Sequence, residues 1–141
     1  MKFNNKYEDI YGNMVDLTEE ELKWFYGIVA KFQMLDEAKG IEIVNRNHEE
    51  LSGKSKEALG EFYTDDPKDE NADCFITIDN YFIHEQFEWV FNGKYNLSFD
   101  TLENVIAHEI AHRFQFRHCK RHTRLTAEIL AKYNETVGNV A

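Results

Sequence analysis

The stretch His108-Glu109-Ile110-Ala111-His112 holds the residues best suited to chemistry in this chain. Residues four apart on an α-helix lie on one face, so His108 and His112 can direct two imidazoles at one metal ion. Glu109 follows the first histidine, and its carboxylate comes near the same ion without having to bind it. There it can take a proton from a water molecule that the ion activates and return it to a leaving group. Zinc (Zn²⁺) fits this role, because neutral imidazole is a good ligand and zinc lowers the pKa of water to about 7.

A catalytic zinc site has three protein ligands and one open position, so a third ligand is required. We prefer His122, because the following Thr123 is a good helix N-cap and the helix after it would hold the histidine in place. His118, which gives the spacing H-E-x-x-H-x5-H, and Glu128 are the alternatives. None of these reaches the ion along a straight helix, on which six further residues add about 9 Å of rise. The chain must therefore turn between Phe116 and His122.

The flanking sequence predicts helices that position these residues. Asp100 and Glu103 form a capping pattern, and apolar residues at helical spacing extend the predicted motif helix as far as Phe116. A last amphipathic helix is predicted over 123–134. The elements predicted before them are a helix over 18–39, strands over 41–44, 61–64 and 74–79, a loop over 45–60 and a short helix over 84–91.

The order of these elements predicts an α+β fold in which an N-terminal helix covers one face of a small sheet. Thr18 and Glu21 form the capping box of that helix. The strands over 61–64 and 74–79 flank an acidic turn and are typical of a hairpin. A length of 141 residues suits a single domain over 1–141. Residues 1–13 are predicted to be a flexible N-terminus.

Composition excludes several classes of protein. An aromatic fraction of 14% is typical of a folded domain. No run of about 18 apolar residues is present, and residues 1–13 hold no apolar signal segment, so we expect no membrane association. Cys74 and Cys119 form no C-x-x-C pair and are expected to be reduced thiols, which predicts a cytoplasmic protein.

Five basic residues lie within twelve positions directly after the motif, although the formal net charge is −10. The overall charge argues against generic binding to phosphate backbones. One interpretation of the basic cluster is a solvated helix edge and turn. The other is a local contact with an anion beside the site: a substrate carboxylate, an acidic partner or nucleic acid. The residues of the cluster are Arg113, Arg117, Lys120, Arg121 and Arg124.

The sequence resembles the SprT-like metallopeptidases and the related WLM group. The resemblance covers about residues 18–135 and rests on the HExxH motif, on His122-Thr123-Arg124-Leu125 after it, and on 58–62 and 74–79 before it. It implies a zincin-like single domain with a small, mostly antiparallel sheet, then the HExxH helix and a C-terminal helix. It also implies cleavage of a protein or peptide substrate. The residues that it implies for the site are His108, His112 and His122 as zinc ligands and Glu109 as general base.

Two functional hypotheses follow. The first is a zinc metallopeptidase (a hydrolase) in which an extended substrate lies along an exposed strand edge, predicted at 74–79. The second is a non-catalytic zinc-binding adaptor that contacts nucleic acid through the basic cluster over 113–124. A structural zinc site has four protein ligands, no open position and no need of a base, so the presence of Glu109 favours the enzyme. The four histidines between 108 and 122 could instead supply all four ligands of a structural site. The residues considered for stabilising the oxyanion are Tyr81, Arg113, Arg117 and Tyr133.

Overall fold

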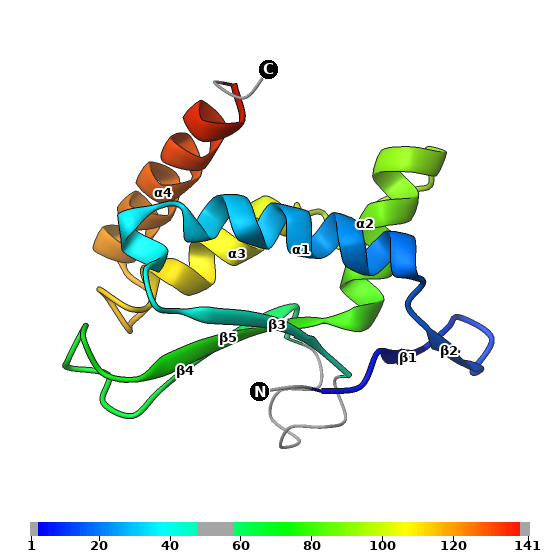
Figure 1. Cartoon of the computed structure of the whole chain (residues 1–141), viewed down its shortest axis with the longest axis horizontal. Helices are drawn as coiled ribbons and strands as arrows, with labels where there is room; N and C mark the ends of the chain where they lie inside the picture. Colours follow the sequence, from blue (N-terminus) through cyan, green and yellow to red (C-terminus); the bar gives the residue numbers. More distant parts are fainter. Residues whose placement is uncertain (1–2, 48–57, 139–141) are drawn as a thin grey trace.

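The computed structural model describes residues 3–47 and 58–138, and they form an α+β domain, which confirms the predicted class (Figure 1). In Figure 1, α1 and α3 lie on the same side of the larger sheet, while α2 and α4 stand at opposite ends of the view. No helix in the two described ranges has the length and apolar character needed to cross a bilayer. In chain order the elements are β1 (Lys6–Glu8), β2 (Met14–Asp16), α1 (Glu19–Gln33), the 3-10 helix η1 (Asp36–Ala38), β3 (Glu42–Arg46), β4 (Gly60–Thr64), β5 (Cys74–Asp79), α2 (Asn80–Asn92), α3 (Leu102–Ala111) and α4 (Lys120–Gly138).

The larger sheet has the strand order β3-β5-β4. β4 and β5 form the predicted antiparallel hairpin around the acidic turn, which confirms that prediction. β5 then runs parallel to β3, so this sheet is mixed rather than mostly antiparallel. The prediction that 74–79 lies at a sheet edge is wrong, because β5 has a hydrogen-bonded neighbour on each side. The edge strand on the hairpin side is β4.

A second, two-stranded sheet joins β1 to β2 in antiparallel register. The segment 1–13, for which the sequence predicts flexibility, contains β1 and its buried Tyr7. Residues 48–57 of the predicted 45–60 loop lie outside the described residues, and the part before them, up to Arg46, belongs to β3.

The core lies between the larger sheet and the helices. The apolar stripe of α1 is buried, as the spacing predicts, and Phe32 stacks on Tyr133 of α4 with ring centroids 4.1 Å apart. Burial of large aliphatic and aromatic side chains of this kind stabilises a fold by about 1.5–3 kcal/mol each. The core members from the stripe, the sheet and α3 include Phe25, Ile28, Val29, Phe32, Ile43, Ile76, Ile78, Ile106 and Ile110.

The ends of the first and last helices differ from the sequence prediction. The Thr18–Glu21 capping box is confirmed, but α1 ends at Gln33 rather than at residue 39. The reason is that the N–H of Leu35 bonds to the carbonyl three residues back, which tightens the last turn and ends the α-helix. α4 begins at Lys120, so Thr123 is not its N-cap: the Thr123 hydroxyl donates to the Cys119 carbonyl inside the first turn.

The two middle helices also begin at other residues than predicted. α2 starts directly after β5 at Asn80, because the Asp79 side chain accepts from the N–H of Phe82 and so caps it. α3 is capped by Thr101 rather than by Asp100, through a hydrogen bond from the N–H of Asn104. α3 ends at residue 111 instead of extending to 116.

A buried ion pair fixes the start of α1 against α2. Oε2 of Glu21 lies 2.7 Å from Nδ1 of His84, and the ring of Tyr7 stacks on the histidine. Burial opposes ionisation of Glu21, but hydrogen bonds from His84 and Thr18 outweigh it and lower the pKa of the carboxyl. The hydrogen bond to Glu21 raises the pKa of His84, against the effect of burial. Both groups are therefore favoured in their charged forms.

Glu21→Gln removes the charge that faces His84 and is expected to lower the free energy of unfolding by about 1–3 kcal/mol at pH 6. Because folding raises the pKa of His84, the ion pair contributes fully to the free energy of unfolding below the unfolded-state pKa of about 6.5. That contribution is lost as pH rises through the pKa of His84 in the folded protein. The stability difference between wild type and variant should therefore shrink between pH 6 and pH 9 in urea titrations.

Glu20→Gln is the matched control, because Glu20 lies in the same helical turn and is exposed. It should change the free energy of unfolding by less than about 0.5 kcal/mol at both pH values. An equal penalty for Glu21→Gln at pH 6 and pH 9 would contradict the assigned ion pair.

Candidate metal centre

The motif histidines lie at the C-terminal end of α3. The apolar side of this helix is fully buried, which fixes its rotation and leaves His108 and His112 on one face. Their ring centroids are 4.9 Å apart. His112 is the C-cap residue, so the helix ends within the motif itself.

A tight turn over 112–114 follows α3, and the chain then bends at Arg117 and Cys119 before α4 begins at Lys120, which confirms the predicted turn between Phe116 and His122. The N–H groups of residues 112–114 bond to carbonyls three residues back, which tightens the turn. The Arg113 guanidinium then ties the turn to two other loops: its Nε donates to the Glu70 carbonyl at 2.8 Å and its Nη1 to the Lys39 carbonyl at 2.7 Å. This reversal brings the following histidines back over α3.

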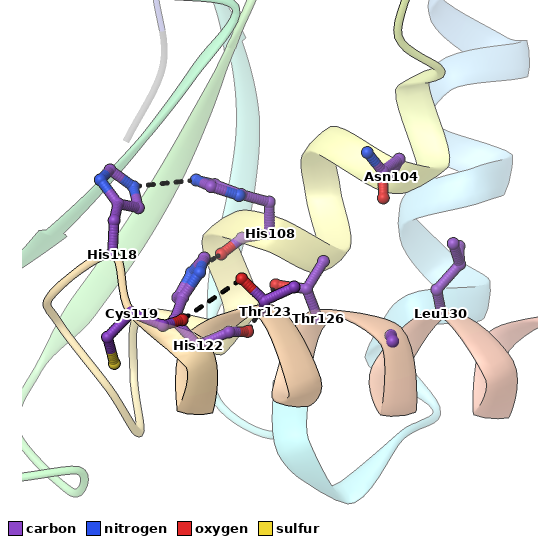
Figure 2. A pocket seen from close by; sticks show the side chains of 9 residues that line it. Asn104, His108, His118, Cys119, His122, Thr123, Thr126 and Leu130 are labelled. Carbon is purple, nitrogen blue, oxygen red and sulfur yellow. Dashed lines mark hydrogen bonds between the residues drawn. The ribbon is translucent and has the colours of Figure 1, made fainter.

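Four histidine rings meet where the turn returns, and Figure 2 shows three of them, His108, His118 and His122. Nε2 of His118 lies 3.1 Å from Nε2 of His108 and 3.1 Å from Nε2 of His112. His122 is buried in the first turn of α4, and its ring stacks on His112 with centroids 4.2 Å apart. A group of three histidines could hold a metal ion: His108, His112 and His122 each offer one ring nitrogen, and these nitrogens lie within 4.8 Å of one another.

The spacing of the nitrogens fits a tetrahedral metal ion. An ion about 2.0–2.1 Å from each nitrogen would separate the nitrogens by about 3.3–3.4 Å, close to the two contacts made by His118. The neutral rings each offer a lone pair, so nitrogens at these separations could bind one cation together. The donor set, three imidazole nitrogens, suits zinc.

His122 makes a different contact from the other three histidines. Its Nε2 lies 2.9 Å from the backbone carbonyl of His108, to which it can donate a hydrogen bond. That carbonyl belongs to the last turns of α3, whose terminal carbonyls have no partner within the helix. The bond therefore ties the first turn of α4 to the residue that carries one of the motif imidazoles, and Figure 2 shows it as a dashed line.

Glu109 lies beside the histidines and is 5% exposed. Its Oε1 is 3.7 Å from Nε2 of His112. Burial, and then the nearby charge of Glu61, raise the pKa of Glu109 to about 8, against the effect of the buried Arg46. A cation held by the histidines would favour the carboxylate form, because an opposite charge at this distance lowers a carboxyl pKa.

The two motif histidines are held in the neutral form that binds metal. Burial, followed by the charges of the neighbouring histidines, lowers the pKa of His108 and of His112 to about 4. Burial also lowers the pKa of His122. At neutral pH these rings keep a free lone pair, which is the form that a divalent cation requires.

Two grooves open onto the histidines from opposite sides. The first, about 300 Å³, lies between β4 and α3 and is lined by Gly60–Phe62, Glu109 and Phe116. The second, about 600 Å³, lies between α3 and α4 and runs past Asn104 and Leu130, both labelled in Figure 2. His108 and His118 line both grooves, so the cluster is open to ligand from each side.

Several residues singled out in the sequence are used elsewhere. Glu128 is exposed on α4 and is not in the group that could hold an ion. Tyr133 stacks in the core, Tyr81 packs near Tyr7, and Arg113 is bound to loop carbonyls, so none of these three lines either groove.

The sequence analysis did not identify the residues from the sheet. Gly60, Glu61 and Phe62 of β4 line the smaller groove, and Arg46 of β3 is buried and acts on the pKa of Glu109. Arg46 is the last residue of β3, and nothing in the sequence marks it as buried, because its place near Glu109 depends on strand order. The other four members of the basic cluster, Arg117, Lys120, Arg121 and Arg124, are exposed.

Comparison with known proteins gives no relative. No family model, curated protein or solved structure matches this chain. The resemblance to SprT-like metallopeptidases therefore stays a prediction from the motif and its surroundings.

The approach of β4 to α3 leaves no room for a side chain at residue 60. A Cβ on Gly60 would lie 2.9 Å from Cδ1 of Ile78, 3.0 Å from Cγ1 of Val105 and 3.3 Å from Cγ of Glu109. Gly60→Ala is expected to push β4 away from α3 and to lower the free energy of unfolding by about 1–3 kcal/mol in urea titrations.

Gly27→Ala is the matched control. Gly27 lies inside α1 with no heavy atom near the added methyl group, so alanine should stabilise the protein by about 0.5–1 kcal/mol. An unchanged stability in Gly60→Ala would show that β4 does not approach α3 this closely.

Proposed function

We propose that this protein is a zinc-dependent metallopeptidase. The observation that carries the proposal is the convergence of histidine Nε2 atoms beside the buried carboxylate of Glu109, at a place open to two grooves. A base next to an accessible metal position is what hydrolysis requires. Cleavage of peptide bonds in particular rests on the resemblance of the motif region to SprT-like metallopeptidases.

We propose His118 as the third ligand, because its Nε2 lies 3.1 Å from Nε2 of both motif histidines. His122, which the sequence prefers, is the alternative: it belongs to the group that could hold an ion, and an Nε2–H donated to the His108 carbonyl leaves its Nδ1 lone pair free. With His118 as the ligand, His122 has a positioning role: it holds the backbone of a ligand in place. Hydrogen bonds from neighbouring groups of this kind tune metal sites without contacting the metal.

In this proposal Glu109 is the general base and later the general acid. Zinc, when bound, would acidify a water molecule and polarise the scissile carbonyl. Glu109 accepts the proton of that water and passes it to the leaving amine. Its burial beneath β4 keeps its carboxylate in one orientation, and the adjacent Arg46 offsets part of the cost of burying a negative charge.

The proposed place for the substrate is the groove along β4. This strand lies at the edge of the sheet, and its residues 60–62 line the groove that ends at the histidines. An extended peptide can add to an edge strand through main-chain hydrogen bonds. Phe62 and Phe116, with ring centroids 6.5 Å apart, give the groove an apolar wall for a substrate side chain.

The rival function is a non-catalytic zinc adaptor. The presence of Glu109 beside the histidines argues against the adaptor, because a structural zinc site needs no base. The basic residues near the start of α4 are exposed. Contact with nucleic acid through them therefore stays a prediction for the adaptor. Binding to DNA at two salt concentrations tests that contact.

Glu109→Gln tests the enzymatic proposal directly. Wild-type protein should contain about one zinc per chain by elemental analysis and should cleave a proteome-derived peptide library followed by mass spectrometry. The variant should keep its zinc and lose hydrolysis by at least about 100-fold, because general base catalysis contributes about that much or more.

Glu128→Gln is the control for Glu109→Gln, since this exposed residue of α4 was the carboxylate alternative for the third ligand. It should keep both zinc and activity. Hydrolysis that survives in Glu109→Gln, or wild-type protein that binds zinc and cleaves no peptide, would contradict the proposal, and the second result would favour the adaptor.

Separate alanine variants of His118 and His122 identify the third ligand. His118→Ala should lower zinc affinity by more than about 100-fold, because a ligand is lost. His122→Ala should lower it by about 10- to 100-fold, the usual effect of removing a group that positions a ligand. Competition with a chromophoric chelator measures both values. The reverse order of affinities would make His122 the ligand and His118 a bystander.

A further inference from the structure

A groove away from the metal centre lies between the β1–β2 connection and α2. It has a volume of about 410 Å³ and is lined by Ile10, Tyr11, Tyr81, Tyr95 and Leu97 together with polar residues. None of its lining residues lines either groove at the histidines. In Figure 1 this part of the molecule, around β1, β2 and α2, lies at the opposite end of the view from α4.

The surface around this groove is unusually apolar for one exposed to water. Exposed apolar clusters of this extent mark interaction sites in soluble proteins, whereas single exposed apolar residues need no explanation. Aromatic residues are also the side chains most enriched at the energetic centres of interfaces. The large exposed apolar side chains that line the groove itself are Ile10, Tyr11, Tyr95 and Leu97.

The segment between α2 and α3 holds its apolar side chains outward in a fixed conformation. The N–H and hydroxyl of Ser98 both donate to Oε1 of Glu85, and the side chain of Asn96 donates to the carbonyl of Asp100. Phe99, whose ring lies edge-on to the groove residue Tyr95 but does not itself line the groove, is 84% exposed and has a φ of 58°, in the left-handed region that a phenylalanine rarely adopts. Strain of this kind persists where the surroundings impose it, and it is frequent at binding sites.

The charge of the groove selects the chemistry of its occupant. Asp9, Glu85 and Glu88 line it, against Lys94 and His84, whose charge is paired with Glu21. Glu85 is 7% exposed and forms no ion pair with a lysine or arginine among the described residues; its hydrogen bonds there come from Ser98. An apolar groove with acidic groups at its base and rim is complementary to a basic side chain flanked by apolar ones.

We propose that this groove is a docking site for a peptide segment of a partner protein, in which a lysine or arginine lies next to aliphatic or aromatic residues. The basic group faces Glu85 and Glu88, while the apolar neighbours pack on Tyr11, Tyr95 and Leu97. The fixed 93–101 segment lowers the entropy lost on binding, because its side chains are presented before the partner arrives. The site is independent of the metal centre and of the proposed hydrolysis.

Selection from a displayed library of random 12-residue peptides tests the proposal on the full chain. Enriched peptides should carry lysine or arginine beside an aliphatic or aromatic residue. A fluorescent copy of an enriched peptide should bind wild type and lose at least tenfold in affinity on Leu97→Ser and on Glu88→Lys. Both positions lie on the surface of the groove, and circular dichroism checks that each variant folds.

Met34→Ser is the matched control, because Met34 is another exposed apolar residue and lies outside the groove. It should bind the peptide as wild type does. Enrichment of peptides without a basic residue, binding that the two groove variants leave unchanged, or no enrichment at all would overturn the proposal. Concentration-dependent dimerisation abolished by Leu97→Ser would also overturn it, by making a second copy the occupant.

Discussion

The reversal of the chain between α3 and α4 is the constraint on which the rest of the site depends. A continued helix would carry residue 118 about 9 Å beyond His112 and onto another face. Instead the helix ends at Ala111, and Arg113 fixes the turn by donating to carbonyls of two loops distant in sequence. The turn that carries the later histidines is thus held by an arginine bound to backbone carbonyls, and the end of one helix determines how the histidines cluster.

The second constraint is the contact between β4 and α3. Gly60 allows the strand to pass within van der Waals distance of Glu109, which excludes water from the carboxylate and raises its pKa. The same contact makes β4 one wall of the groove that reaches the histidines. Glu109, the histidine cluster and the groove along β4 therefore share a single packing interface, so a change at residue 60 should affect all three.

The sequence predicts what is local in this site and fails where long-range contacts decide. The i and i+4 spacing of His108 and His112 follows from helix geometry, and the structure agrees. The strand positions of the hairpin were also predictable from alternation and its acidic turn. Strand order was not, because nothing in residues 74–79 tells that β5 pairs on both sides.

The third ligand was ambiguous for the same reason. Thr123 has the side chain of an N-cap, but α4 begins three residues earlier, which puts His122 inside the helix and His118 in the turn. That turn contains no glycine or proline to locate it, and its geometry depends on Arg113 reaching loops that lie 43 and 74 residues away in the chain.

The X-ray absorption spectrum of the zinc-loaded protein at the zinc edge tests this geometry most directly. We predict three imidazole nitrogens at about 2.0–2.1 Å and one exchangeable oxygen donor. Four imidazole ligands, or fewer than three, would contradict the account.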